Sequence, residues 1–157
     1  MIRKVIVPLF LVCSLLITSN LVDARAIFSI RVQVNGSPIS LESGSTDAEP
    51  YIEQETNTAY VPLRFISQNL GGKVSWDRSK QQVTILSDEG TVTTLVVGSK
   101  VAYVNNEKKT LSDAPFMLHY PNRIIVPLRF VSEVLGATVD ATKSSDGMLH
   151  VNITMTK

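Results

Sequence analysis

The chain has 157 residues and one cysteine, and it carries 15 Lys and Arg against 14 Asp and Glu. A net charge of +1, with basic and acidic residues interspersed, lacks the basic footprint of nucleic-acid-binding proteins, so we expect no nucleic-acid partner. A single cysteine excludes an intrachain disulfide and a cysteine-based zinc site, because both need several thiols. One soluble globular domain fits this length and composition.

Residues 1–26 have the pattern of a secretory signal peptide. Arg3 and Lys4 precede an apolar run over residues 5–17, and the segment closes on the small-x-small cleavage pattern Ala24-Arg25-Ala26. The apolar run is shorter than the roughly 20 residues that an α-helix needs to cross a bilayer, which favours cleavage after Ala26 over a retained anchor. We therefore expect a secreted chain, residues 27–157, with no transmembrane segment after cleavage.

The mature chain begins with a predicted hairpin. Residues 28–34 alternate between apolar and polar side chains, which predicts a half-buried strand. Asn35-Gly36 favours the positive backbone dihedrals of a tight turn, which leads into a second strand over residues 37–41. Two short strands should follow around Tyr51 and Tyr60.

A short helix is predicted after these strands. Pro62 suits a first helical position, and Gly71 can adopt the left-handed conformation that ends a helix. The apolar residues of this segment stand at helical spacings of three and four and form one stripe: Leu63, Ile66 and Leu70. A helix this short is unstable alone in water, so the stripe should pack on a sheet. A hairpin with strands over 73–76 and 82–86 comes next.

The same order of elements recurs 65 residues later, which indicates an internal repeat. The segment Val-Pro-Leu-Arg-Phe-Ile-Ser at 61–67 recurs as Val-Pro-Leu-Arg-Phe-Val-Ser at 126–132. The copies span about 28–86 and 91–155 and are joined by residues 87–90. The elements predicted in the second copy are strands over 100–104 and 108–111, short strands around Phe116 and Ile124, a helix from Pro127 to Gly136, and a hairpin of 138–140 with 148–155.

These elements predict an α+β fold, mainly antiparallel β-sheet with two short helices. Each copy has about 65 residues and no disulfide, which is too little to bury a stable core alone. We therefore expect two pseudo-equivalent halves that share one core.

Two segments of the chain carry a resemblance to a known family. Residues 60–77, Tyr-Val-Pro-Leu-Arg-Phe-Ile-Ser-x-x-Leu-Gly-Gly-Lys-Val-Ser-Trp-Asp, and residues 97–105, Val-Gly-Ser-Lys-Val-Ala-Tyr-Val-Asn, resemble the copper amine oxidase N-terminal domain-like family, also called stalk domains. The resemblance covers residues 28–153. It implies a non-catalytic module of exported Gram-positive bacterial surface proteins that holds neither the copper nor the oxidation chemistry. The second copy departs from the pattern, because Ala141 stands where a tryptophan is expected.

The sequence predicts no enzyme, no cofactor and no metal site. The mature chain has only His119 and His150, whereas a type-two copper site uses several imidazoles. No tyrosine lies in the Asn-Tyr-acid context of the quinone cofactor, and no Gly-x-Ser-x-Gly elbow occurs. The acidic residues Glu49, Glu53 and Glu55 lie in a turn-rich stretch, which favours a solvated surface over a catalytic pair.

Two arginines and four aromatic residues are the candidate binding residues. Arg64 and Arg129 lie in the first turns of their helices, where a cation opposes the macrodipole and needs a partner. A structural ion pair or hydrogen bond is favoured over an anionic ligand, and Glu133 can meet Arg129 on one helix face. The residues that could stack on sugar rings are Tyr60, Trp76, Tyr103 and Tyr120. Cross-strand packing is the favoured explanation for these aromatic residues.

The resulting hypothesis is a non-catalytic, secreted or cell-envelope-associated structural or recognition module. Its partner would be a cell-wall polymer or another surface protein. The alternative is a small extracellular enzyme, or an enzyme subunit, that acts on cell-wall polymers. Buried carboxylates with shifted pKa values in one cleft would favour the enzyme, and a shallow surface without them would favour the module.

Overall fold

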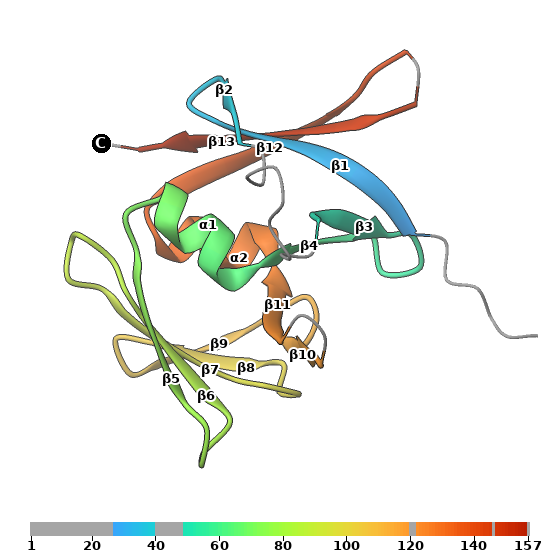
Figure 1. The fold of residues 1–157 in the computed structure, drawn as a ribbon. Helices are drawn as coiled ribbons and strands as arrows, with labels where there is room; N and C mark the ends of the chain where they lie inside the picture. Colours follow the sequence, from blue (N-terminus) through green and yellow to red (C-terminus); the bar gives the residue numbers. More distant parts are fainter. Residues whose placement is uncertain (1–26, 40–48, 120–121, 146, 157) are drawn as a thin grey trace, which may run out of the picture.

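The computed structural model describes residues 27–39, 49–119, 122–145 and 147–156. Within these ranges the chain forms two short helices and two β-sheets, most of whose strand pairs are antiparallel (Figure 1). The predicted α+β class is therefore confirmed. The predicted signal peptide, residues 1–26, lies outside the described residues.

The larger sheet has eight strands and is organised around β1. In sheet order its strands are β10 (Phe116–Leu118), β11 (Arg123–Pro127), β4 (Thr58–Pro62), β3 (Tyr51–Glu53), β1 (Ile27–Val34), β13 (Leu149–Met155) and β12 (Ala137–Lys143), with β2 (Ser37–Pro38) paired to β1. Strand β1 changes partner along its length, since residues 27–29 pair antiparallel with β3 and residues 30–34 pair parallel with β13. This long strand joins the two parts of the sheet.

The smaller sheet is a five-stranded antiparallel sheet. Its strands in order are β5 (Lys73–Asp77), β6 (Gln82–Leu86), β7 (Val92–Val96), β8 (Val101–Val104) and β9 (Glu107–Thr110). Strand β7 was not predicted. Its sequence, Val-Thr-Thr-Leu-Val, buries Thr93 beside Leu95, so one of its two inward positions is polar and the apolar alternation is incomplete.

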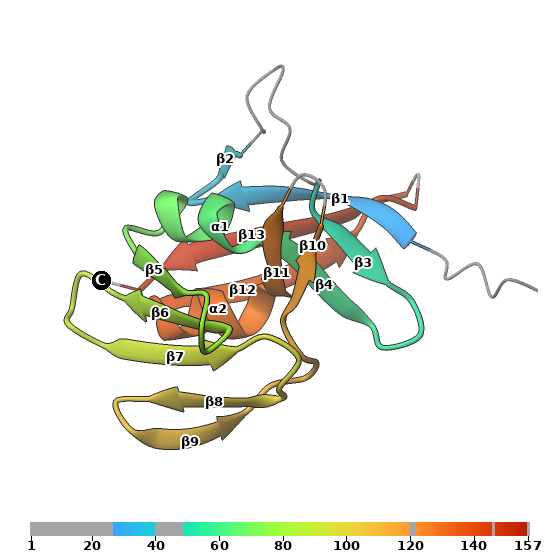
Figure 2. The ribbon, with the colours of Figure 1, turned by 60° about the horizontal axis from the view of Figure 1, so that its bottom comes forward.

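Both helices lie between the two sheets (Figures 1 and 2). Helix α1 (Leu63–Asn69) and helix α2 (Leu128–Val134) bury the predicted apolar stripes. The prediction for Pro62 was wrong, because this residue is the N-cap, with φ −61° and ψ 127°, and also the last residue of β4. The proline ring fixes only φ, and pairing of Pro62 with Ile125 across the sheet holds ψ in the extended range. Gly71 takes the predicted left-handed conformation, with φ +74°.

One buried cluster draws residues from both sequence halves and both sheets. The hairpin β12–β13, late in the chain, pairs with β1, and the hairpin β5–β6 is joined through β7 to β8 and β9. Strands β10 and β11 and helix α2 begin 65 residues after β3, β4 and α1, which is the spacing of the repeat interpreted from the sequence. Each half therefore completes its sheet with strands of the other half.

Candidate functional site

A groove of about 530 Å³ lies between helix α1, the β5–β6 hairpin and the β10–β11 hairpin, and we call it the Trp76 groove. Its lining consists of four aliphatic or thioether side chains, one indole, three guanidinium groups and two amides: Leu63, Val74, Met117, Ile124, Trp76, Arg64, Arg78, Arg123, Gln81 and Asn122. No aspartate or glutamate is among them. The groove combines an apolar surface with a concentrated positive charge.

Alternation along β5 places Trp76 in the groove. Val74 and Trp76 lie two residues apart on one face of this strand, and both line the groove. Strand β5 is an edge strand of its sheet, so no further described strand of that sheet lies on its outer side. The indole is half-buried and packs against the core cluster, which holds its position.

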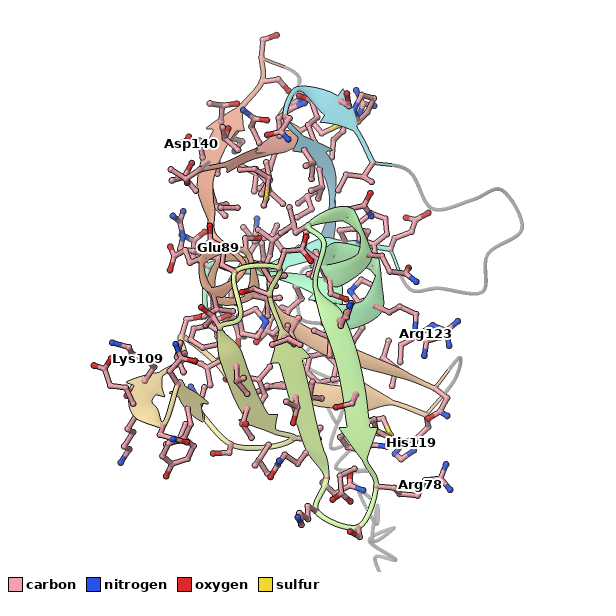
Figure 3. All side chains as sticks on the ribbon, turned by 90° about the vertical axis from the view of Figure 1, so that its left-hand side faces the viewer. Arg78, Glu89, Lys109, His119, Arg123 and Asp140 are labelled. Carbon is pink, nitrogen blue, oxygen red and sulfur yellow. The ribbon has the colours of Figure 1, made fainter. Side chains whose placement is uncertain are left out.

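Helix α1 and the β10–β11 hairpin supply the opposite side of the groove. In the first turn of α1, Leu63 is buried and Arg64 is exposed, and both line the groove. In the hairpin, Met117 pairs with Ile124 across the two strands. Arg123, the first residue of β11, follows immediately after the turn. Figure 3 shows Arg123, His119 and Arg78 along one side of the molecule, beside the β5–β6 hairpin.

Two of the groove's arginines, Arg64 and Arg78, are not neutralised by an acidic side chain among the described residues. In the described part of the chain, no hydrogen bond or ion pair engages the guanidinium group of Arg64 or Arg78. Asp77, next to Trp76, faces its own turn, where Oδ1 accepts hydrogen bonds from Ser79 Oγ at 2.6 Å and from the Ser79 and Lys80 backbone amides. The hydrogen bond from the Ser79 hydroxyl, first among these, holds the pKa of Asp77 below its ordinary value.

A second groove of about 350 Å³ occupies the corresponding place in the other half of the chain. Leu128, Arg129 and Val139 line it at positions 65 residues after Leu63, Arg64 and Val74. Two correspondences differ in chemistry, because Ala141 stands in place of Trp76 and Thr58 in place of Arg123. Among the described residues, the lining of the second groove therefore lacks the indole and contains one cation, Arg129, where the Trp76 groove has three.

The two helix arginines have different surroundings. Arg129 Nη1 donates a hydrogen bond to the Val139 carbonyl oxygen at 3.0 Å, so strand β12 supplies its partner. Of the two structural alternatives stated from the sequence, Arg129 has the hydrogen bond, and the ion pair with Glu133 does not occur among the described residues. Arg64 has no equivalent bond to β5, and its guanidinium group remains available to the groove.

The aromatic candidates do not form one face. Tyr60 is 3% exposed, and its ring packs on Tyr51 and Phe116 at centroid distances of 5.4 and 5.5 Å, so it is a core residue and not a stacking platform. Tyr103 is exposed on β8, a strand that contributes nothing to the groove lining. Tyr120 lies outside the described residues. Among the described candidates, Trp76 alone lines the groove.

A polar link that the sequence did not suggest connects the two halves of the chain. The Tyr60 hydroxyl donates a hydrogen bond of 2.7 Å to Asp113 Oδ2, and Asp113 Oδ1 is 3.1 Å from Lys100 Nζ and 2.8 Å from the Ala114 amide nitrogen. Burial raises the pKa of Tyr60 far above its ordinary value, and the bond from Tyr60 holds the pKa of Asp113 below its own. The partners stand 53 residues apart, so no local pattern indicates the link.

The prediction of a solvated Glu53 was wrong. Its side chain is 7% exposed, because β3 turns this position inward, and Thr56 Oγ1 donates a hydrogen bond to Glu53 Oε2 at 3.2 Å. Glu53 and Asp113 line one small cavity with Tyr60. The pKa of Asp113 is held below its ordinary value, so this carboxyl carries no proton to donate as a general acid near neutral pH.

Two further features bear on ligands and membranes. The described residues contain no group of three or more His, Cys, Asp or Glu side chains that could hold a metal ion. His119 is exposed and His150 is half-buried on β13.

Among the described helices, none has the length and apolarity needed to cross a bilayer.

Comparison with known proteins identifies the family. No curated protein matches the sequence. The family model of the copper amine oxidase N-terminal domain matches residues 33–148, which include most of both sheets and both helices. The N-terminal domain of this family is a non-catalytic, stalk-type domain. The chain therefore belongs to the copper amine oxidase N-terminal domain family, as its sequence motifs predicted.

Proposed function

We propose that this chain is an exported, non-catalytic module that recognises a component of the cell envelope. The observation that carries the proposal is the chemistry of the Trp76 groove. Its lining offers an indole, aliphatic surface, amides and guanidinium groups, but no acid, no nucleophile and no base that can exchange a proton near neutral pH. Such a surface can hold a ligand, and it has no group to transform one.

The chemistry of the chain outside the groove also supports this function. Residues 1–26 carry the signal-peptide pattern, and residues 27–157 contain no cysteine, so an oxidising extracellular setting would form no disulfide within residues 27–157. The family match adds a stalk-type domain, a class of domain without catalysis. A cell-wall polymer is the partner class we propose, with another surface protein as the second.

Two measurements test this proposal. Mass spectrometry of the culture medium should find the chain beginning at Ile27, and the purified chain should sediment with insoluble cell-wall material without releasing reducing sugars or peptides. An intact Met1 form in the membrane fraction would contradict export. Failure to sediment with any wall fraction would contradict recognition, and steady release of wall fragments would establish the alternative, an enzyme acting on wall polymers.

A further inference from the structure

The Trp76 groove has the features of a site for an anionic sugar. We propose that it binds an anionic saccharide, with a sugar ring against the Trp76 indole and a carboxylate, sulfate or phosphate group held by Arg64 and Arg78. The inference rests on the proposed recognition function and names the chemical class of its ligand.

The charge of the groove is the first support. Arginine presents a planar fork of donors that matches carboxylate, sulfate and phosphate oxygens two at a time. The guanidinium groups of Arg64 and Arg78 have no partner in the described part of the chain, and no acidic residue lines the groove. An incoming anion would therefore find free donors and would also relieve repulsion among like charges.

The indole and the amides favour a saccharide over a simple inorganic anion. The face of a half-buried indole offers an apolar plane that is already ordered, which suits the flat C–H surface of a pyranose ring. Gln81 and Asn122 each carry a donor and an acceptor, as sugar hydroxyls do. Gln81 Nε2 donates to the Arg78 carbonyl oxygen at 3.0 Å, which fixes its amide in the β5–β6 turn. An acidic peptide could pair with the arginines through its carboxylates and with the amides through its backbone N–H and C=O groups, so the apolar plane of the indole is the feature that favours a sugar ring.

The second groove shows that the fold alone does not create these features. At the corresponding positions, Arg129 is bonded to the Val139 carbonyl, Ala141 offers no ring and Thr58 offers no charge. The volume falls from about 530 to about 350 Å³. The same arrangement of helix and strands thus occurs twice, once with the helix arginine bonded to a carbonyl, as Arg129 is, and once with it unbonded among the described residues, as Arg64 is. The second groove therefore provides a matched control for the Trp76 groove.

Fluorescence offers a direct titration, because the chain contains a single tryptophan and that tryptophan lies in the groove. The probes are tetragalacturonate, which carries carboxylates, a heparin-derived tetrasaccharide, which carries sulfates and carboxylates, and glucose 1-phosphate, which carries a phosphate. The controls are maltotetraose, which is neutral, tetraglutamate, which is an acidic peptide, and inorganic phosphate. We expect saturable change in Trp76 emission with at least one anionic saccharide, weaker binding at high salt, and little change with the controls.

Variants assign the binding to the groove. Arg64→Gln combined with Arg78→Gln should weaken the saccharide affinity at least tenfold, whereas Arg129→Gln in the second groove should leave it unchanged. Arg64 and Arg78 are exposed, so the double variant should fold, and its melting curve verifies this. Should the double variant not fold, Arg78→Glu alone should produce the same loss of affinity.

Several outcomes would overturn the inference: no anionic saccharide binds, maltotetraose or tetraglutamate binds as well as the best saccharide, or the groove variants bind like wild type. Sedimentation with cell-wall material distinguishes failure of the saccharide inference from failure of the proposed function. If the wild-type chain and the double variant both sediment, recognition stands and the groove is not its site. If the wild-type chain does not sediment with any wall fraction, the proposed function itself falls.

Discussion

Replacing Tyr60 by phenylalanine tests the link between β4 and the segment that follows β9. The change removes the hydroxyl that donates to Asp113 at 2.7 Å and keeps the ring that packs on Tyr51 and Phe116. Asp113 keeps its contacts with Lys100 and the Ala114 amide. The variant therefore isolates one hydrogen bond to a carboxylate.

The expected cost follows from this geometry. A hydrogen bond to a charged group contributes about 1.5–3 kcal/mol, and loss of one from a group that keeps other partners falls at the lower end. The Asp113 side chain is 22% exposed, so water can also replace part of the bond. We expect Tyr60→Phe to lower the free energy of unfolding by about 1.5 kcal/mol and the melting temperature by roughly 5 °C.

The effect should depend on pH in a defined direction. The pKa of Tyr60 is raised by burial, so above about pH 10 the unfolded chain loses this proton while the folded chain keeps it, and the stabilisation from Tyr60 declines. The pKa of Asp113 is lowered, so its contribution is present above the ordinary value of 3.8 and is lost as the pH falls through its folded value. The gap between wild type and variant should be widest between about pH 5 and 9 and narrow on both sides.

Urea unfolding followed by tryptophan fluorescence measures this gap across the pH series. Tyr103→Phe is the matched control, since Tyr103 is 47% exposed, and its free energy of unfolding should stay within about 0.5 kcal/mol of wild type. A Tyr60→Phe chain as stable as wild type at pH 7 would refute the reasoning. A gap that is constant from pH 3 to 11 would refute the assignment of the two pKa shifts.

The remaining predictions concern the core, the helix arginines, cooperativity and copper. Leu128→Ala should lower the free energy of unfolding by about 2–5 kcal/mol, because this side chain is 1% exposed, and a loss below about 1 kcal/mol would remove it from the core. Arg129→Ala should cost about 1 kcal/mol through its bond to β12, whereas Arg64→Ala should cost less than about 0.5 kcal/mol; equal losses would contradict the difference between the grooves. Calorimetry of the mature chain should give one transition, and two separate transitions would show that the halves fold independently. Copper titration should give at most weak binding, and stoichiometric copper with peroxide release from an amine would contradict a non-catalytic domain.

Local patterns predicted the parts of the fold that depend on neighbouring residues. The turn at Asn35-Gly36 has the positive φ angles that its residue types favour, and the helix stripes are buried as their spacing indicated. Strand β7 was not predicted because Thr93 occupies one of its two inward positions. A polar residue there breaks the alternation of apolar and polar side chains that indicates a strand. The burial of Glu53 was not predicted for a similar reason. Glu53 is the last residue of β3 and polar turn residues follow it, so the sequence did not distinguish this inward strand position from the turn.

The site was predictable only in part. Arg64 and Trp76 were among the candidates from the sequence, Arg64 together with Arg129 and Trp76 together with three tyrosines, and a structural role was favoured for both groups. Their meeting with Arg123 depends on how the β10–β11 hairpin packs beside β5, and that arrangement is set by the whole sheet order. A hydrogen bond to a carbonyl was one of the two structural alternatives for Arg129, but the sequence did not indicate which carbonyl, because Val139 is close to Arg129 only in three dimensions.

The parallel pairing of β1 with β13 has a consequence for the order of folding. The strand nearest the amino terminus of the described chain pairs over residues 30–34 with the strand nearest the carboxyl terminus, so the larger sheet cannot close until nearly all of the chain has been made. Closing a loop of this length is entropically costly and slow, which keeps the nascent chain open for longer than a fold built from local hairpins would. A chain whose larger sheet has not yet formed is also still able to pass unfolded through a narrow channel. Strand β13 pairs with both β1 and β12, so a chain that lacked β13 would expose an unpaired edge on each of these strands. Such a truncated chain would not be a smaller stable domain.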